Sequence, residues 1–241
     1  MRMHAIGLAI LLGLFACQST DPESTDPGSA VSRPHHERKR IHAPLRDSPP
    51  HSPRDISSYV ARLENPKRVE ALQVERVLEE LTLPGFATVA DIGSGPGVFA
   101  LPLAHSLPHG LVYAVDIEPQ QLDALRERAE EAGLRNIVPV LASMDDPHLP
   151  PGRIDLVLVI DTYHHIEDRA AYFERVRGAL VPGGRLAIVE WKAGELPMGP
   201  PPERKLAPGL RPRELGEAGY QLVEQHDFHA FHDFEVWDPV D

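Results

Sequence analysis

The chain has 241 residues, 42% of them hydrophobic, which is enough for one sizeable core and too little for two. Lys and Arg number 24 against 36 Asp and Glu, so the formal net charge is −12 at pH 7 and the pI is near 5.5. Binding to a phosphate backbone relies on clustered basic residues, so this balance argues against nucleic acid as a partner. We expect one folded unit, acting as a monomer.

The first 17 residues have the features of an export signal. Arg2 precedes an apolar run from Ala5 to Phe15 that is too short to span a bilayer. The run ends in Leu-Phe-Ala-Cys, and Cys17 is the only cysteine, so no disulfide within the chain can form. A plain secretory signal with an incidental cysteine, or a start codon placed too far upstream, are the alternatives.

The Leu-x-Ala-Cys ending resembles the lipobox of bacterial lipoproteins. That resemblance implies lipid attachment at Cys17 and a place in the bacterial cell envelope, on the outer membrane or its periplasmic face. With a misplaced start codon, the protein would instead be cytoplasmic. Residues 18–54 are Ser, Thr, Asp, Pro, His and Arg with almost nothing apolar, so we interpret them as a disordered linker.

The folded domain should cover residues 55–241 and begin with two helices, the second starting at Asn65-Pro66 and ending near Leu83. Strands and helices then alternate, which indicates an α/β fold with a parallel, doubly wound sheet. The expected strands are 88–92, 111–115, 137–141, 154–160 and 185–190; the expected helices are 98–107, 119–132, 169–180 and 213–218. Two further strands, 220–224 and 231–237, should close the chain.

A glycine-rich turn follows the first strand, in the sequence Asp-Ile-Gly-Ser-Gly-Pro-Gly that begins at Asp91. Such a turn lets backbone pass close to a ligand at the start of a helix. The next strand ends in Asp116, whose carboxylate can accept both hydroxyl protons of a ribose. A dinucleotide site would have its third glycine at position 98, where this chain has Val98.

Together these features resemble class I S-adenosylmethionine (SAM)-dependent methyltransferases with a type 11-like methyltransferase domain. The resemblance implies a Rossmann-like seven-stranded sheet of order 3-2-1-4-5-7-6 with an antiparallel last strand and helices on both faces. Proline139 fits this order, because a proline cannot donate to a central ladder and the third strand lies at an edge. It also implies SAM as the cofactor, bound by Asp91, Gly93, Ser94, Gly95, Gly97, Asp116, Ile117, Met144, Asp145, Asp161 and His165.

In doubly wound sheets, ligands bind beyond the carboxyl ends of the strands, so residues 161–165 and 190–191 should face the transferred methyl group. His164 is the first candidate for a base, because its ordinary pKa lies near neutral pH. Asp161 and Tyr163 are further catalytic candidates. The alternative is that His164 only lines the pocket and that His165 is the family's recurrent, cofactor-side histidine.

The acceptor is expected to be a small or lipid-like molecule, methylated at O, N or C. The folded domain has no thiol nucleophile, and Asp161-Thr162-Tyr163-His164 replaces the Asn/Asp-Pro-Pro-aromatic motif of amino-group methylases. We predict no metal site: His226 and His232 share a strand face that His229 opposes, which favours a solvent-facing hairpin. Two alternatives remain, an envelope-anchored SAM-binding protein without turnover and, disfavoured by Val98, an NAD-dependent oxidoreductase.

Overall fold

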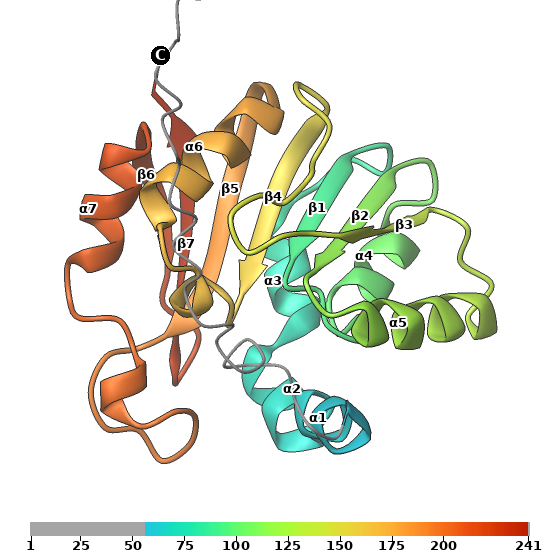
Figure 1. The fold of residues 1–241 in the computed structure, drawn as a ribbon, viewed down its shortest axis with the longest axis horizontal. Helices are drawn as coiled ribbons and strands as arrows, with labels where there is room; N and C mark the ends of the chain where they lie inside the picture. Colours follow the sequence, from blue (N-terminus) through green and yellow to red (C-terminus); the bar gives the residue numbers. More distant parts are fainter. Residues whose placement is uncertain (1–55, 241) are drawn as a thin grey trace, which may run out of the picture. The chain divides into compact units, whose positions relative to one another are not determined.

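The structure, a computed structural model, describes residues 56–240. They contain a seven-stranded sheet of order β3-β2-β1-β4-β5-β7-β6 (Figure 1). The strands are β1 (Thr88–Ile92), β2 (Leu111–Asp116), β3 (Ile137–Leu141), β4 (Ile154–Ile160), β5 (Leu180–Trp191), β6 (Tyr220–His226) and β7 (His232–Pro239). β1 to β5 run parallel to one another, whereas β7 is antiparallel to both β5 and β6. The predicted fold class and strand order are confirmed.

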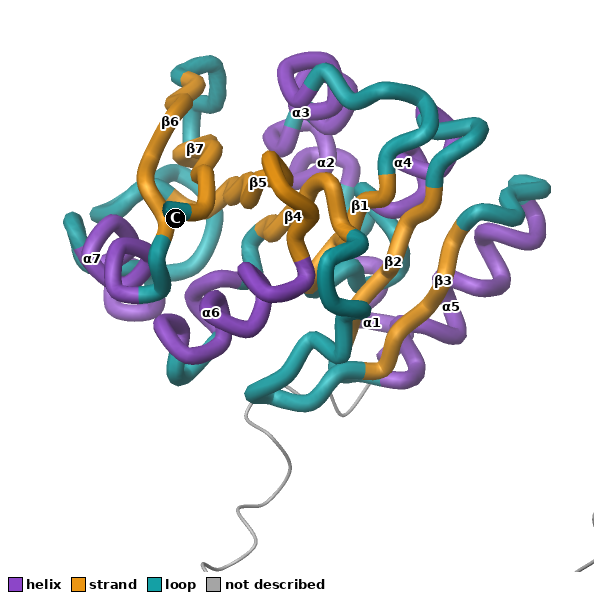
Figure 2. Tube along the Cα trace, turned by 90° about the horizontal axis from the view of Figure 1, so that it is seen from above, coloured by secondary structure: helices purple, strands orange, loops and turns teal. Residues whose placement is uncertain are grey.

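Helices cover both faces of the sheet, as Figure 2 shows. α3 (Val74–Leu81), α4 (Ala100–Ser106) and α5 (Pro119–Glu131) bury Val77, Leu103 and Leu125 in one core. α6 (Arg169–Ala179) and α7 (Leu210–Glu217) bury Phe173 and Leu215 in a second core on the opposite face. The remaining helices are α1 (Ile56–Leu63), α2 (Pro66–Leu72) and two short 3₁₀ turns, η1 (Tyr163–His165) and η2 (Pro202–Arg204).

β4 lies at the centre of the sheet and has apolar residues on both faces. All of its residues are buried except Asp155, whose carboxylate accepts the Thr88 N–H at 2.7 Å. β1 pairs with β4 on one side and β2 on the other, so the direction of winding reverses at β1. The carboxyl ends of β1 and β4 therefore border the crevice where doubly wound sheets bind ligands.

β3 is an edge strand, as predicted from Pro139. This residue lies opposite Ala114 of β2, its only neighbouring strand in the sheet order. A proline without an N–H is tolerated there because one side of an edge strand makes no ladder hydrogen bonds.

The N-terminal helices differ from the prediction. One helix was expected from Pro66 to near Leu83, but the chain breaks at Gln73, which has a left-handed φ of 47°. The Gln73 side chain donates to the Phe228 carbonyl at 3.2 Å, and both Leu72 and Val74 are buried. The break turns two short amphipathic helices onto different parts of the core, which local periodicity does not reveal.

The C-terminal histidines also differ from the prediction of a solvent-facing hairpin. His229 and His232 are only 2% and 1% exposed. The chain turns between β6 and β7, which brings His229 Nδ1 within 3.3 Å of the Ala71 carbonyl. The same turn packs the His232 ring against the Trp191 ring, with centroids 4.1 Å apart. Within residues 56–240, no three His, Cys, Asp or Glu side chains are placed to share a metal ion.

The predicted signal peptide, Cys17 and the linker lie outside the described residues. Among residues 56–240, no helix has both the length and the apolar character needed to cross a membrane.

Candidate active site

The glycine turn is fixed by its neighbouring strand. The N–H groups of Gly93 and Ser94 both donate to the Val115 carbonyl, at 2.8 and 3.0 Å. Gly93 has a φ of 76°, and a Cβ there would lie 2.1 Å from Thr162 Oγ1. Only glycine fits this position, because the loop after β4 packs directly on the turn.

Asp116 holds the same turn from below. Its Oδ2 accepts the Gly95 N–H at 2.8 Å and its Oδ1 accepts the Glu118 N–H at 2.9 Å. Burial raises the pKa of Asp116 above its ordinary value, although these two N–H donors oppose the shift. Each carboxylate oxygen has a second lone pair, so Asp116 can still accept hydroxyl protons. Ile117, half-buried, follows it directly.

Gly97 is the glycine of the turn that lies against α5. Its φ is 102°, and a Cβ there would lie 2.4 Å from Leu125 Cδ1. Gly97 therefore lets α5 pack against the turn, and its predicted contact with the cofactor stays a prediction. Gly95 has a φ of 53°, with Leu63 of α1 lying 3.2 Å from the place of its Cβ.

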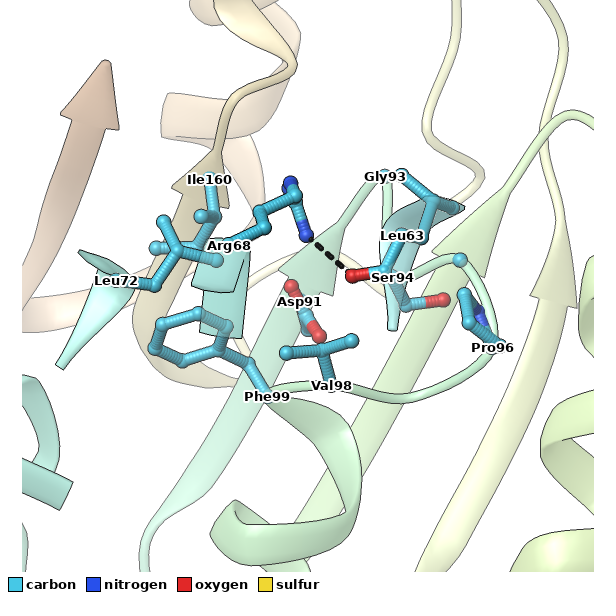
Figure 3. A pocket seen from close by; sticks show the side chains of 11 residues that line it. Leu63, Arg68, Leu72, Asp91, Gly93, Ser94, Pro96, Val98, Phe99 and Ile160 are labelled. Carbon is cyan, nitrogen blue, oxygen red and sulfur yellow. Dashed lines mark hydrogen bonds between the residues drawn. The ribbon is translucent and has the colours of Figure 1, made fainter. Parts of the chain in front are cut away.

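A small cavity opens at the turn, and Figure 3 shows the side chains around it. Asp91, Gly93, Ser94 and Gly95 line it together with Leu63, Arg68, Leu72, Pro96, Val98, Phe99 and Ile160. Its volume is about 30 Å³, room for about two water molecules. Leu63 and Arg68, which sequence reasoning missed, bring α1 and α2 over the predicted residues.

Several buried polar atoms at the turn lack a hydrogen-bond partner. They are Asp91 Oδ2, Ser94 Oγ and both amide atoms of Gln121, in side chains that are at most 5% exposed. Burial, and then the charge of Asp116, raise the pKa of Asp91 to about 7. Buried polar groups are normally satisfied, so this cluster indicates a site for a polar ligand. Gln121, on the first turn of α5, was also missed.

Met144 and Asp145 do not join this cavity. They line another of about 240 Å³, together with Glu167, Asp168, Ala171 and Arg175. The exposed Asp145 carboxylate accepts the Ser143 hydroxyl at 2.8 Å, a bond that lowers its pKa. The predicted contacts of Met144 and Asp145 with SAM therefore stay predictions.

Asp161 follows β4 and has a left-handed φ of 48°. Its Oδ2 accepts from Arg68 at 2.8 Å, and its Oδ1 lies 3.1 Å from His232 Nε2. Burial favours the neutral acid, but the nearby His232 and Arg68 outweigh it and lower the pKa of Asp161. Asp161 is therefore an anion that joins α2, the β4 loop and β7.

Tyr163 lies in the core instead of facing a substrate. Its side chain is 0% exposed, stacks on Phe173 at 5.1 Å, and donates its hydroxyl to Glu214 at 3.1 Å. Burial and the Glu214 charge raise its pKa, so it stays protonated. This position removes Tyr163 from the catalytic candidates.

His164 is hydrogen-bonded to Glu190. Both belong to the two segments, 161–165 and 190–191, that we predicted to face the transferred methyl group. The Nδ1 of His164 lies 2.9 Å and 3.0 Å from the two Glu190 oxygens, and its backbone N–H donates to Glu190 at 3.2 Å. Glu190 is 1% exposed. Burial lowers the pKa of His164, but the hydrogen bond and charge of Glu190 outweigh burial and raise it.

An ionised carboxylate can only accept hydrogen bonds, so the Nδ1 of His164 carries the proton. Its Nε2 is then the nitrogen that can take up a proton. The ring of exposed His165 lies beside that of His164, tilted by 43°, with ring centroids 4.0 Å apart. His164 and Glu190 thus have the arrangement of a general base and the acid that orients it.

Comparison with known proteins shows what this domain is similar to. Residues 89–184 match the family described as "Methyltransferase domain". The crystal structure of a SAM-dependent methyltransferase from Aquifex aeolicus superimposes with a TM-score of 0.71 and 26% identity, covering 76% of this chain and 97% of that one.

Curated relatives are similar over part of their length. The aklanonic acid methyltransferase DauC of Streptomyces sp. (strain C5) is 32% identical over 123 residues, which are 50% of this chain and 56% of that protein. The 27-O-demethylrifamycin SV methyltransferase of Amycolatopsis mediterranei is 27% identical over 158 residues, 65% of this chain and 56% of that protein. The chain thus spans little more than half of these two relatives.

Together with the fold, these findings support a class I SAM-dependent methyltransferase, and they support SAM as the cofactor, as predicted from the glycine turn. The residues present fit that group. Asp91 Oδ2 and Ser94 Oγ are buried without partners, and SAM has an ammonium group and hydroxyls to satisfy such atoms.

Proposed function

We propose that this protein is a methyltransferase that transfers the methyl group of SAM to a small or lipid-like acceptor whose reacting O–H or N–H loses its proton to His164. The observation that carries the proposal is the His164–Glu190 pair, with Nδ1 and Oε2 2.9 Å apart. His164 of this pair comes shortly after Thr162, whose side chain packs on the glycine turn.

Bound SAM supplies a methyl group on a sulfonium centre that is open to in-line attack. The chain contributes orientation and one proton transfer. Glu190 fixes the imidazole with Nδ1 protonated, so Nε2 faces the acceptor as a base and Glu190 stabilises the imidazolium that forms. Thr162 packs on the glycine turn, so it joins the loop that carries His164 to the turn that would hold the cofactor. This contact aligns the two reactants.

The small-molecule class is supported by the relatives, which are named for aklanonic acid and 27-O-demethylrifamycin SV. The net charge of −12 also disfavours an acceptor with a phosphate backbone. Identity at 27–32% over part of the chain does not extend these two substrates to this protein.

A methyl-acceptor screen with labelled SAM and the full chain tests the proposal. The panel contains phenols, enols, amines and lipid-like alcohols, and S-adenosylhomocysteine is the measured product. Label transfer to a protic acceptor, lost in His164→Gln, is the expected result. SAM binding without product across the panel would favour the binding-protein alternative, and binding of NAD without SAM would favour the oxidoreductase.

Glu190→Gln tests whether the Glu190 carboxylate tunes and orients His164 or only packs against it. The amide keeps the shape but removes the charge that raises the pKa of His164, so the acidic limb of the pH–rate profile should move to lower pH. We expect kcat to fall about tenfold or more, on the scale of positioned acid–base catalysis. An unmoved profile with normal kcat would contradict the role of this pair. Glu195→Gln, on the exposed loop after β5, is the matched control.

We also propose that Cys17 carries a lipid that anchors the protein in the cell envelope, as the lipobox-like ending suggests. Two or more acyl chains at about 0.8 kcal/mol per buried methylene would make release negligible. Fatty acid labelling should be lost in Cys17→Ser, and the wild type should fractionate with membranes. Equal labelling, or a soluble cytoplasmic protein that retains Met1, would overturn this proposal.

A further inference from the structure

The small cavity at the glycine turn has a single cation among its eleven lining residues, Arg68 of α2. Figure 3 shows its side chain reaching over the cavity from the side of α2, with the guanidinium above Asp91. The side chain is 19% exposed, so it is largely withdrawn from water. A cation and an acid therefore face the same small space.

The Arg68 guanidinium is held by two hydrogen bonds and still has N–H donors left. One terminal nitrogen donates to the Leu63 carbonyl at 2.9 Å, and the other donates to Asp161 Oδ2 at 2.8 Å. These bonds use two of the five N–H donors of an arginine. These two bonds position the guanidinium over the cavity, and three donors remain for another acceptor.

The opposite wall supplies acceptors and a hydroxyl. Asp91 Oδ2 and Ser94 Oγ are buried, lack partners, and line the cavity. The methionine part of SAM carries an ammonium and a carboxylate on one carbon. Asp91 matches the ammonium in charge, and the planar fork of Arg68 matches the carboxylate.

We propose that Arg68 binds the carboxylate of the cofactor while Asp91 binds its ammonium group. This inference rests on the proposed function, because it assumes that SAM is the ligand of the turn. Asp161 keeps His232 Nε2 at 3.1 Å, so it retains a second partner if Arg68 shifts toward the cofactor.

Access to the site requires a movement of the same segment. A cavity of about 30 Å³ cannot hold SAM, and Leu63 lies 3.2 Å from the place of a Cβ on Gly95. Leu63 and Arg68 are joined by their hydrogen bond, so a displacement of the α1–α2 junction moves both. Arg68 would thus be brought back over the cofactor as the junction closes.

The test is a thermodynamic cycle in which the Arg68 side chain and the carboxylate of the ligand are removed separately and together. Calorimetry measures the Kd of SAM and of decarboxylated SAM, which lacks only the carboxylate, for the full-length wild type and for Arg68→Met. Lys67→Met, an exposed neighbour on the same helix, is the matched control. Arg68→Gln keeps an N–H donor for Leu63 or Asp161, and serves if the methionine variant fails to fold.

In the wild type and in Lys67→Met, we expect SAM to bind at least about tenfold more tightly than decarboxylated SAM, the scale of a hydrogen bond between charged groups. In the Arg68 variants this preference should fall to about twofold or less. A general loosening of the fold weakens both ligands alike, so it cancels in the ratio.

An unchanged preference in the Arg68 variants would overturn the assignment, since the carboxylate would then be recognised elsewhere. If the wild type binds SAM and transfers methyl groups while the preference is unchanged, only this inference fails. If the wild type does not bind SAM at all, the proposed function fails with it.

Discussion

Asp91 should make SAM binding depend on pH in a way that can be calculated. Burial, and then the charge of Asp116, raise its pKa to about 7 in the free protein, and its Oδ2 has no partner. The ammonium of a bound cofactor would favour the ionised carboxylate and lower that pKa. Binding below pH 7 should therefore release a proton, and the affinity should rise with pH and level off above 7.

With a free-state pKa of about 7, roughly one Asp91 in eleven is ionised at pH 6, and most are ionised at pH 8. If only the ionised form binds, the Kd at pH 6 should be about tenfold that at pH 8. Calorimetry in two buffers with different ionisation enthalpies measures both the Kd and the protons released.

His164 needs separate control, because the hydrogen bond and charge of Glu190 raise its pKa as well. The titration should be done in the His164→Gln background, with Asp91→Asn as the comparison. The asparagine variant should bind more weakly at pH 8 and show no pH dependence between 6 and 8. A flat wild-type profile, an affinity that falls with pH, or the same slope in both proteins would refute the reasoning.

Two further outcomes follow from the geometry. Asp116→Ala should weaken SAM binding by about 1–3 kcal/mol by calorimetry, while exposed Asp123→Ala on the adjacent helix should change it by less than about 0.5 kcal/mol; equal effects would sink the ribose assignment. Gly199→Ala should lower the melting temperature and shift the Trp191 emission, because its Cβ would lie 2.5 Å from that ring, whereas Gly194→Ala in the same loop has a similar positive φ and open space. Equal melting temperatures would show that the loop simply moves away.

The sheet could be predicted from the sequence because its signals are local. Apolar runs bounded by turns gave β1 to β4 within a residue or so, and Pro139 identified the edge strand through its missing N–H. Asp91 and the first glycines were found for the same reason, because strand, turn and helix are adjacent in the chain. β5 begins at Leu180, five residues before the predicted start, since Leu180 already pairs with Ile154 of β4 ahead of a register shift in that ladder.

The contacts that complete the site are not local. Arg68 and Asp161 are 93 residues apart, and His164 and Glu190 are 26 apart. Tyr163 and His164 are adjacent in the chain, yet one is buried on Glu214 and the other is held by Glu190. Because a 3₁₀ turn replaces the expected loop, neighbouring side chains diverge, and no periodicity in the sequence foretells which one meets the pocket.

The bond between Asp116 and Gly95 has a consequence for how affinity can evolve. The turn is already pinned before any ligand arrives, so its ordering entropy is lost during folding and not on binding. Variation at the α1–α2 junction can therefore tune how fast and how tightly a cofactor is taken up while the cradle beneath stays the same shape. The pre-ordered turn and the segment that controls access thus lie in separate parts of the chain, so the segment can change while the turn keeps its shape.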